Sequence, residues 1–341
     1  MILALAISSF ILSYLLTDVI RRYAISKGLQ QEPNERSSHQ QLTPHGGGLA
    51  IVISFIVACV IGYYFELFDQ NIVLSVSIGG GLVAAVGFYD DHNPTSIKIR
   101  ISVQFFCAVL AILLLGGLPD ISYGVFSLEF GYIGYIVGVF FLVWMTNLYN
   151  FMDGIDGFAS LEAMTTTGCM AIVLMVSTKF QSVWYLNNLL VACVLGFFFW
   201  NFPKARIFMG DVGSYFLGFV SGVIMIKSWN FNIDIIFSWV ILLSVFITDA
   251  SYTLLSRFLR REGIFVAHRS HAYQIASRKL GSHVKVSMIL VGINILWLFP
   301  LAYLVAKKIV HPLVGLALSY LPLIAIAWFL GAGKPEPKNH Q

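Results

Sequence analysis

Acidic and amide side chains with the chemistry of a cation site recur at short spacings in this chain. One group is an adjacent pair, Asp90 and Asp91, and the other is Asn150, Asp153 and Asp156, spaced by three. Adjacent carboxylates repel each other unless a proton or a divalent cation relieves the repulsion. The second group has no Lys or Arg between its members, so a bound cation would remove a costly cluster of negative charge. We favour a cation-dependent site there, whereas the aspartate pair taken alone is better explained as a solvated interfacial cap and gains weight only from its companions.

Asp211 and a run of three glycines extend this set. Asp211 stands where an apolar run begins, so it could be a hard oxygen ligand for a metal ion, the N-cap of a helix, or both. The glycines at 46–48 could bring backbone N–H groups to a phosphate, which makes Gly46 and Gly47 candidate substrate contacts. The competing interpretation is a flexible entry to a helix.

A segment with two histidines could contact a substrate. His268 and His271 are three apart, but no Cys and no Glu-x-x-His pair completes a zinc set. Hydrogen bonding to phosphate or sugar is a better use of these rings beside Arg269. The alternative for the arginines is a basic surface that attracts anionic lipid headgroups. Further candidate contacts are Arg36, His39, Lys98 and Arg100.

The segments that must position these residues set the class of the protein. Of the 341 residues, 58% are apolar and 11% are charged, and the mean hydropathy is +0.81. Soluble domains are about 45–50% apolar and about 25% charged. A hydrocarbon core of about 30 Å needs about 20 apolar residues per helix. We therefore predict an all-α, polytopic integral membrane protein of about 10–11 transmembrane helices, near residues 1–20, 47–67, 72–89, 101–118, 131–148, 158–178, 183–200, 212–226, 233–255, 286–306 and 310–330.

Basic residues predict the orientation of these helices. Alternate gaps and the tail at 331–341 contain 17 of the 21 Lys and Arg residues. The positive-inside rule therefore places these segments in the cytoplasm and the N-terminus outside. The first apolar run has Arg21 and Arg22 after it rather than before it, which is not the pattern of a cleavable signal peptide. We expect one membrane domain whose site lies on the cytoplasmic loops 21–46, 90–100, 149–157, 201–211 and 256–285.

The four cysteines and the net charge point to no further chemistry. Each Cys lies in a predicted span and none forms a C-x-x-C pair, so we infer neither a disulfide nor a metal site from them. The net charge of +4 suits an anionic leaflet or an anionic substrate and gives no argument for nucleic acid.

The order of the polar motifs resembles that of a known family. The motifs lie at 33–39, 46–48, 90–91, 150–157, 208–214 and 268–274. Together they resemble the polyprenyl-phosphate N-acetylhexosamine-1-phosphate transferases, the MraY/WecA-like superfamily of glycosyltransferase family 4. The first and last motifs most resemble those of its WbpL-like branch. The resemblance covers about residues 28 to 285.

The resemblance implies a magnesium-dependent phosphoglycosyltransferase. Such an enzyme transfers an N-acetylhexosamine 1-phosphate from a UDP-sugar to undecaprenyl phosphate and releases UMP, which starts O-antigen or another surface polysaccharide. It would work in the bacterial cytoplasmic (inner) membrane with Mg²⁺ or Mn²⁺. The sugar would be of the fucosamine, quinovosamine or glucosamine type, and a homodimer is one oligomeric state that the resemblance allows. By position, the implied catalytic residues are Asp90, Asp91, Asp153 and Asp156, the metal ligands are Asp211 and Asp153, and substrate contacts include Asn150, His268, Arg269 and His271.

Two positions depart from the pattern of the family. Gln31 stands where relatives often have Asp, and His45 stands where they often have Arg. Both lie near the first predicted substrate segment, so its contacts are open. Two other classes of protein remain alternatives, a polytopic secondary transporter and a non-catalytic scaffold. Transporters place their polar residues near the bilayer midplane, whereas these carboxylates lie at span ends, which favours the enzyme.

Overall fold

Apolar runs of about 20 residues leave a helix as the only way to satisfy the backbone in lipid, and helices make up most of the structure. The computed structural model describes residues 1–31, 42–93, 95–123, 126–175, 181–229, 233–263 and 268–335. The first half contains α1 (Ile2–Ser26), α2 (Gly48–Tyr64), α3 (Gln70–Leu74), η1 (Ser75–Gly80), α4 (Gly81–His92), α5 (Ile97–Leu115), α6 (Gly131–Met152) and α7 (Phe158–Leu174). The second half contains α8 (Gln181–Asn201), α9 (Gly210–Trp229), α10 (Ile233–Leu242), α11 (Ser244–Leu259), α12 (Ala272–Leu280), α13 (His283–Ile293), η3 (Asn294–Leu298), α14 (Phe299–Ala306) and α15 (Pro312–Leu330).

The predicted class is confirmed. Eight of the described helices are long and apolar enough to cross a membrane, or nine if the bent pair α10 and α11 is one span. The shorter apolar helices α2 and α7 have 17 residues each, at the lower limit for crossing. Each of the eleven predicted runs therefore coincides with an observed helix, a broken helix or a bent pair.

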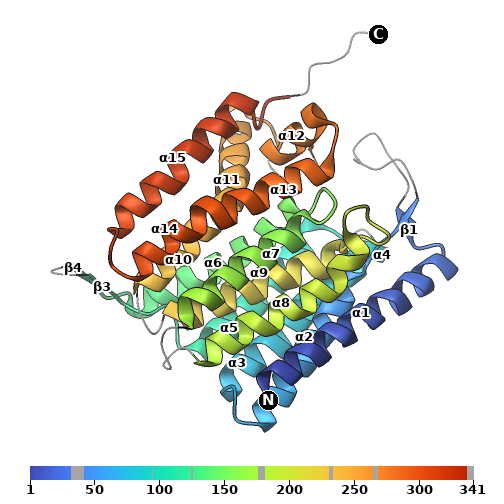
Figure 1. Cartoon of the computed structure of the whole chain (residues 1–341), viewed down its shortest axis with the longest axis horizontal. Helices are drawn as coiled ribbons and strands as arrows, with labels where there is room; N and C mark the ends of the chain where they lie inside the picture. Colours follow the sequence, from blue (N-terminus) through green and yellow to red (C-terminus); the bar gives the residue numbers. More distant parts are fainter. Residues whose placement is uncertain are drawn as a thin grey trace.

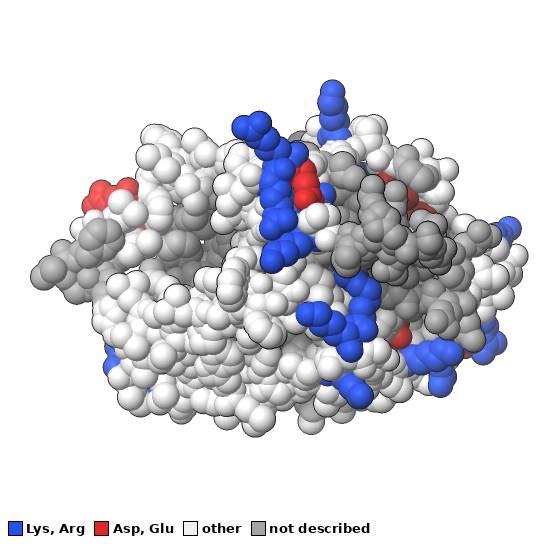
Figure 2. Space-filling view, turned by 90° about the horizontal axis from the view of Figure 1, so that it is seen from above, with Lys and Arg blue, Asp and Glu red and all other residues white. Residues whose placement is uncertain are grey.

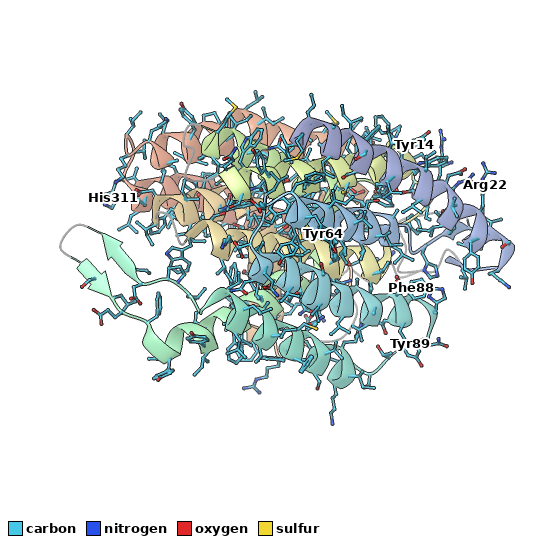
Figure 3. All side chains as sticks on the ribbon, turned by 90° about the horizontal axis from the view of Figure 1, so that it is seen from below. Tyr14, Arg22, Tyr64, Phe88, Tyr89 and His311 are labelled. Atoms are coloured by element: carbon cyan, nitrogen blue, oxygen red, sulfur yellow. The ribbon has the colours of Figure 1, made fainter. Side chains whose placement is uncertain are left out.

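Two small antiparallel pairs connect helices. Strands β1 (Gln30–Gln31) and β2 (Thr43–Pro44) pair with Gln30 opposite Pro44, and β3 (Ile121–Tyr123) and β4 (Phe126–Leu128) pair with Ile121 opposite Leu128. Figure 1 places β1 and α12 at one end of the helix bundle and the β3–β4 hairpin at the other. We call these the cavity end and the hairpin end. Figure 3 agrees, because Arg22 and Tyr89 lie toward one end and His311 toward the other.

Helix α9 lies at the centre of the bundle. Of its most apolar 18-residue window, 89% is buried, and it packs against α2, α4 and α6. Gly218 and Gly222, four residues apart, let α6 approach closely, because a Cβ at Gly218 would collide with the backbone of Met145. Small residues at this spacing are typical of close helix pairs in membranes. Gly87 allows a similar approach between α4 and the start of α9, because a Cβ there would lie 2.5 Å from the carbonyl oxygen of Asp211.

Basic side chains are unevenly distributed along the bundle. On the face shown in Figure 2, most Lys and Arg side chains lie in the half that contains α12, and much of the remaining described surface carries no charge. An uncharged belt with large apolar side chains exposed, among them Leu113, Phe140 and Leu321, suits contact with lipid.

Candidate active site

Asp91 and Asp211 are joined where α4 ends and α9 begins. The carboxylate of Asp91 accepts hydrogen bonds from the backbone N–H groups of Asp211 (2.9 Å) and Val212 (3.3 Å). A carboxylate at a helix N-terminus satisfies N–H groups that have no partner within the helix. Gly210 is required beside it, since its φ is +77° and a Cβ there would lie 2.5 Å from Oδ2 of Asp91. The Gly-Asp motif therefore brings Asp211 against the aspartate pair.

Arg100 links the second aspartate of the pair to the same place. Its Nη1 lies 2.7 Å from Asp90 Oδ2, 3.9 Å from Asp211 Oδ2 and 3.3 Å from the hydroxyl of Tyr215. Thr95 donates to Asp90 Oδ1 from both its backbone N–H (2.6 Å) and its hydroxyl (2.5 Å). Predicted residues separated by more than 100 positions thus form one hydrogen-bonded cluster. The sequence prediction did not include Thr95 or Tyr215.

The Asn150 segment closes the cluster from α6. The side-chain amide of Asn150 donates to Asp211 Oδ1 (2.8 Å) and to Ser214 Oγ (3.1 Å). Asp153 follows as the C-cap of α6, and no described residue donates a hydrogen bond to its carboxylate. Burial, together with the negative charges of Asp211 and Asp156, raises the pKa of Asp153 to about 7. This partly buried acid therefore lacks a compensating partner within the described chain.

Asp156 has different surroundings from the rest of the predicted set. Its Oδ2 lies 3.3 Å from Nδ1 of His283, and its backbone carbonyl accepts a hydrogen bond from the Ser287 hydroxyl (3.0 Å). These contacts join the loop after α6 to α13. The geometry gives Asp156 a place in holding the loop.

The two histidines lie together in the loop that leads into α12. Their ring centroids are 5.0 Å apart, and His268 Nδ1 contacts the Ser270 hydroxyl at 3.0 Å. Burial, followed by the charges of His271 and Arg257, lowers the pKa of His268 to about 4. His268 is therefore neutral near pH 7 in this structure.

A cavity of about 610 Å³ lies between the histidines and the acid cluster. Its polar lining includes Arg100, Asn147, Asn150, Tyr215, His268, His271 and Gln274. Its apolar lining includes Ile97, Ile101, Phe140, Val143, Trp144 and Leu254. Phe140 is 59% exposed on the side of α6, so the apolar wall continues to the lipid-facing surface. The cavity can hold an anionic group at one wall and a hydrocarbon chain at the other.

Several predicted contacts lie elsewhere. Lys98 is exposed on α5, and neither it nor Arg269 lines this cavity. The N–H groups of Gly47 and Gly48 donate to the carbonyls of Phe208 and Met209 at 2.9 Å each. These two donors therefore bind the loop before α9 and are not free for a phosphate, which gives Gly47 a packing role. Gly46 has a φ of +88° with nothing within 4 Å of the place where a Cβ would lie.

Two more predicted contacts, Arg36 and His39, lie outside the described residues. Conversely, the cavity includes Asn147, Tyr273 and Gln274, which were not predicted as site residues although Tyr273 and Gln274 belong to the motif at 268–274. Asp249 of α11 was missed as well, although a carboxylate inside an apolar run is a signal for function.

The donor chemistry fits a divalent cation. Asp153 and Asp211 supply carboxylate oxygens, the hard ligands that Mg²⁺ prefers, and the cationic side chain within 4 Å of Asp211 is Arg100. In the described parts of the chain, no three His, Cys, Asp or Glu residues already have the arrangement of a metal site. The two aspartates would therefore leave several coordination positions to water and to substrate, as Mg²⁺ sites commonly do.

Comparison with known proteins adds the family. Residues 73–229 match the family described as glycosyl transferase family 4. The chain is 28% identical to a "Probable undecaprenyl-phosphate N-acetylglucosaminyl 1-phosphate transferase" of Bacillus subtilis (strain 168), over 78% of this chain and 75% of the relative. It is 30% identical to an "Undecaprenyl-phosphate alpha-N-acetylglucosaminyl 1-phosphate transferase" of Yersinia pestis, over 65% of this chain and 62% of the relative. It is also 30% identical to a "Phospho-N-acetylmuramoyl-pentapeptide-transferase" of Streptococcus gordonii, over 62% of this chain and 69% of the relative.

Proposed function

The chain belongs to glycosyl transferase family 4, in the MraY/WecA-like superfamily, and from this we propose that it transfers a sugar 1-phosphate from a UDP-sugar to undecaprenyl phosphate. UMP is the second product. The transfer to undecaprenyl phosphate is extended from the relatives, and a UDP-sugar donor follows from the motif resemblance; both agree with the chemistry that the cavity can accommodate.

One observation carries the proposal. Arg100 and Asn150 line a cavity that has an apolar wall open toward lipid, and behind them they contact Asp90 (2.7 Å) and Asp211 (2.8 Å) of the acid cluster. An acceptor with a phosphate on a polyprenyl chain needs both features within a few ångströms of each other. A transporter would need polar groups near the middle of the bilayer instead.

Arg100 is suited to hold the phosphate of the acceptor. It lines the cavity, and a guanidinium makes bidentate contacts with phosphate oxygens. Asp90 fixes this guanidinium at 2.7 Å and can accept a proton that remains on the acceptor phosphate. Both oxygens of Asp91 accept N–H groups of α9, so we assign Asp91 to positioning Asp211.

His268 and His271 are suited to hold the sugar nucleotide from the other side of the cavity, and Asn150 could contact it from the side of the acid cluster. Asp211 and Asp153 would hold the magnesium ion, and manganese could replace it. When bound, such an ion neutralises charge on the diphosphate and on the departing UMP. An oxygen of the lipid phosphate attacks the β-phosphorus, and the bond from that phosphorus to the bridging oxygen breaks, so that this oxygen leaves with UMP.

The names of the relatives favour UDP-N-acetylglucosamine as the donor. The motif resemblance to the WbpL-like branch keeps the fucosamine and quinovosamine types as alternatives. We propose a role at the start of O-antigen or another surface polysaccharide. We also propose the bacterial cytoplasmic membrane as the location, with the cavity end in the cytoplasm, because 17 of 21 Lys and Arg lie in the segments assigned to that side.

The test is a reaction with purified protein, undecaprenyl phosphate and a panel of UDP-N-acetylhexosamines, with magnesium or with EDTA. We expect UMP release with one of the sugars, a lipid diphosphate sugar identified by mass spectrometry, and no product in EDTA. If a folded sample forms no product with any sugar, the proposal is wrong. Uptake of a solute into proteoliposomes without UMP release would support the transporter instead.

A further inference from the structure

Asp249 is a buried carboxylate within α11 whose two oxygens are fully engaged. Its side chain is 5% exposed. Oδ1 accepts from the backbone N–H of Ala272 (2.8 Å) and from the Thr253 hydroxyl (3.2 Å), and it lies 3.2 Å from Nδ1 of His271. Oδ2 accepts from the backbone N–H of Tyr273 (2.8 Å). A buried carboxylate is costly unless donors compensate it. Here the donors come chiefly from His271 and from the first two residues of α12, which follow it.

The contact with His271 determines which ring nitrogen faces a ligand. A carboxylate accepts, so the Nδ1 that faces Asp249 must carry the proton. His271 is itself 3% exposed and lines the cavity, which leaves Nε2 as the nitrogen available there. The ring is also confined between His268 and Phe151, with centroid distances of 5.0 and 6.4 Å. The carboxylate thus sets both the tautomer and the direction of this imidazole.

The same carboxylate fixes the loop to the acid side of the cavity. It holds the first two N–H groups of α12, and the Tyr273 hydroxyl donates to the carbonyl of Phe151 (3.1 Å) at the end of α6. Gly154 accommodates that hydroxyl, because a Cβ at this position would collide with it. The path from Asp249 through α12 therefore ends next to Asn150 and Asp153.

We propose that Asp249 is the positioning residue that directs Nε2 of His271 toward the diphosphate of the sugar nucleotide. The inference rests on the proposed function and adds a residue to it. Asp249 does not touch the substrate and acts through His271. When a diphosphate is bound, the paired carboxylate also stabilises positive charge on the imidazole, as carboxylates that orient histidines do at other sites.

A double-mutant cycle tests this role. Asp249→Asn keeps the shape of the side chain, and we expect kcat/KM for UDP-N-acetylglucosamine, or for the sugar that the panel identifies, to fall about 10- to 100-fold. We expect most of this fall to come from a higher KM, because His271 would contact the diphosphate before the reaction. In a His271→Ala background, Asp249→Asn should cost several-fold less than in the wild-type background, because only the contacts of Asp249 with the N–H groups of Ala272 and Tyr273 are then lost. Asp234→Asn, at a buried acid near the hairpin end, is the matched control and should leave kcat/KM unchanged.

The possible outcomes separate the two proposals. Wild-type protein that releases no UMP contradicts the proposed function. Active wild-type protein with an unchanged Asp249→Asn variant, or with equal losses in both backgrounds, overturns the role of Asp249. If Asp249→Asn cannot be purified folded, nitrogen NMR of histidine-labelled wild-type protein decides instead, with the His271 signal assigned by comparison with His271→Gln. We expect a proton on Nδ1 of His271, and a proton on Nε2 alone would overturn the inference.

Discussion

The acids at the two ends of the bundle are compensated in different ways. At the hairpin end, Asp69 lies 2.6 Å from Nζ of Lys227, and Asp234 lies 3.7 Å from Nζ of Lys308. In the acid cluster at the cavity end, Asp90 and Asp211 share one arginine, Arg100, at 2.7 and 3.9 Å, and among the described residues no Lys or Arg forms an ion pair with Asp91 or Asp153. An acid with its own lysine is explained by the fold alone. An excess of acids over cations within one cluster indicates a ligand from outside the chain.

Asp211→Asn should give the largest effect. Loss of this carboxylate removes an oxygen ligand from the proposed cation site, and we expect magnesium-dependent UMP release to fall at least about 100-fold. Asp69→Asn is the counterpart at the hairpin end and should stay within about twofold of wild type. Thermal unfolding and gel filtration check that both variants fold. Turnover near wild type by Asp211→Asn would exclude Asp211 from the site.

Arg100→Lys should give the next largest effect. Nη1 of Arg100 makes the contacts with Asp90, Asp211 and Tyr215, which leaves the other guanidinium nitrogens for phosphate oxygens, whereas lysine offers a single ammonium for both. We expect kcat/KM for undecaprenyl phosphate to drop about 10- to 100-fold. Lys227→Arg keeps charge in the same way at the hairpin end and serves as the control. Equal activity of the two variants would mean that the geometry around Arg100 is unimportant.

The buried imidazole of His268, at the cavity end, predicts that the folded protein loses stability at acidic pH. The pKa of His268 is about 4 in the folded chain, against about 6.5 for an unperturbed histidine. The unfolded chain therefore binds a proton at His268 more tightly than the folded chain does. The stability of the folded state that depends on a neutral His268 is lost as the pH falls from about 6.5 to about 4. We expect His268→Gln to show a shallower decline of melting temperature over that range. His311→Asn, at an exposed histidine of the hairpin end, should decline as wild type does.

Lys98→Ala should give the smallest effect. Lys98 is exposed on α5 and does not line the cavity, although its motif made it a candidate substrate contact. We expect kcat/KM for both substrates to stay within about twofold of wild type. A loss of tenfold or more would show that the substrate extends beyond the described cavity. The site at the cavity end would then include Lys98.

Much of the fold was predictable because lipid leaves few choices for an apolar segment of 20 residues. The convergence of Asp90, Asn150 and Asp211 was also predictable, since helix ends on one side of a membrane share a surface. The bend of 67° between α10 and α11 was not, because residues 233–255 form one continuous apolar run.

Contacts of individual side chains were harder to predict than their neighbourhood. Asp156 carries the same motif spacing as Asp153, yet its carboxylate meets His283, a residue 127 positions later that no pattern assigns to it. Gly47 belongs to a glycine run that resembles a phosphate-binding loop, but its N–H group donates to the carbonyl of Phe208. Asp249 was read as part of a span, although a buried acid there could have been noticed. The roles of Arg36 and His39 remain predictions.

The contact between Asp91 and the start of α9 has a consequence for biosynthesis. The acid that caps α9 comes from α4, 120 residues earlier in the chain. During translation, α4 therefore enters the bilayer well before its partner exists, and the cluster forms only after α9 has inserted and docked. A ribosome that stops before residue 210 leaves a membrane-embedded fragment that contains the aspartate pair but cannot assemble the site.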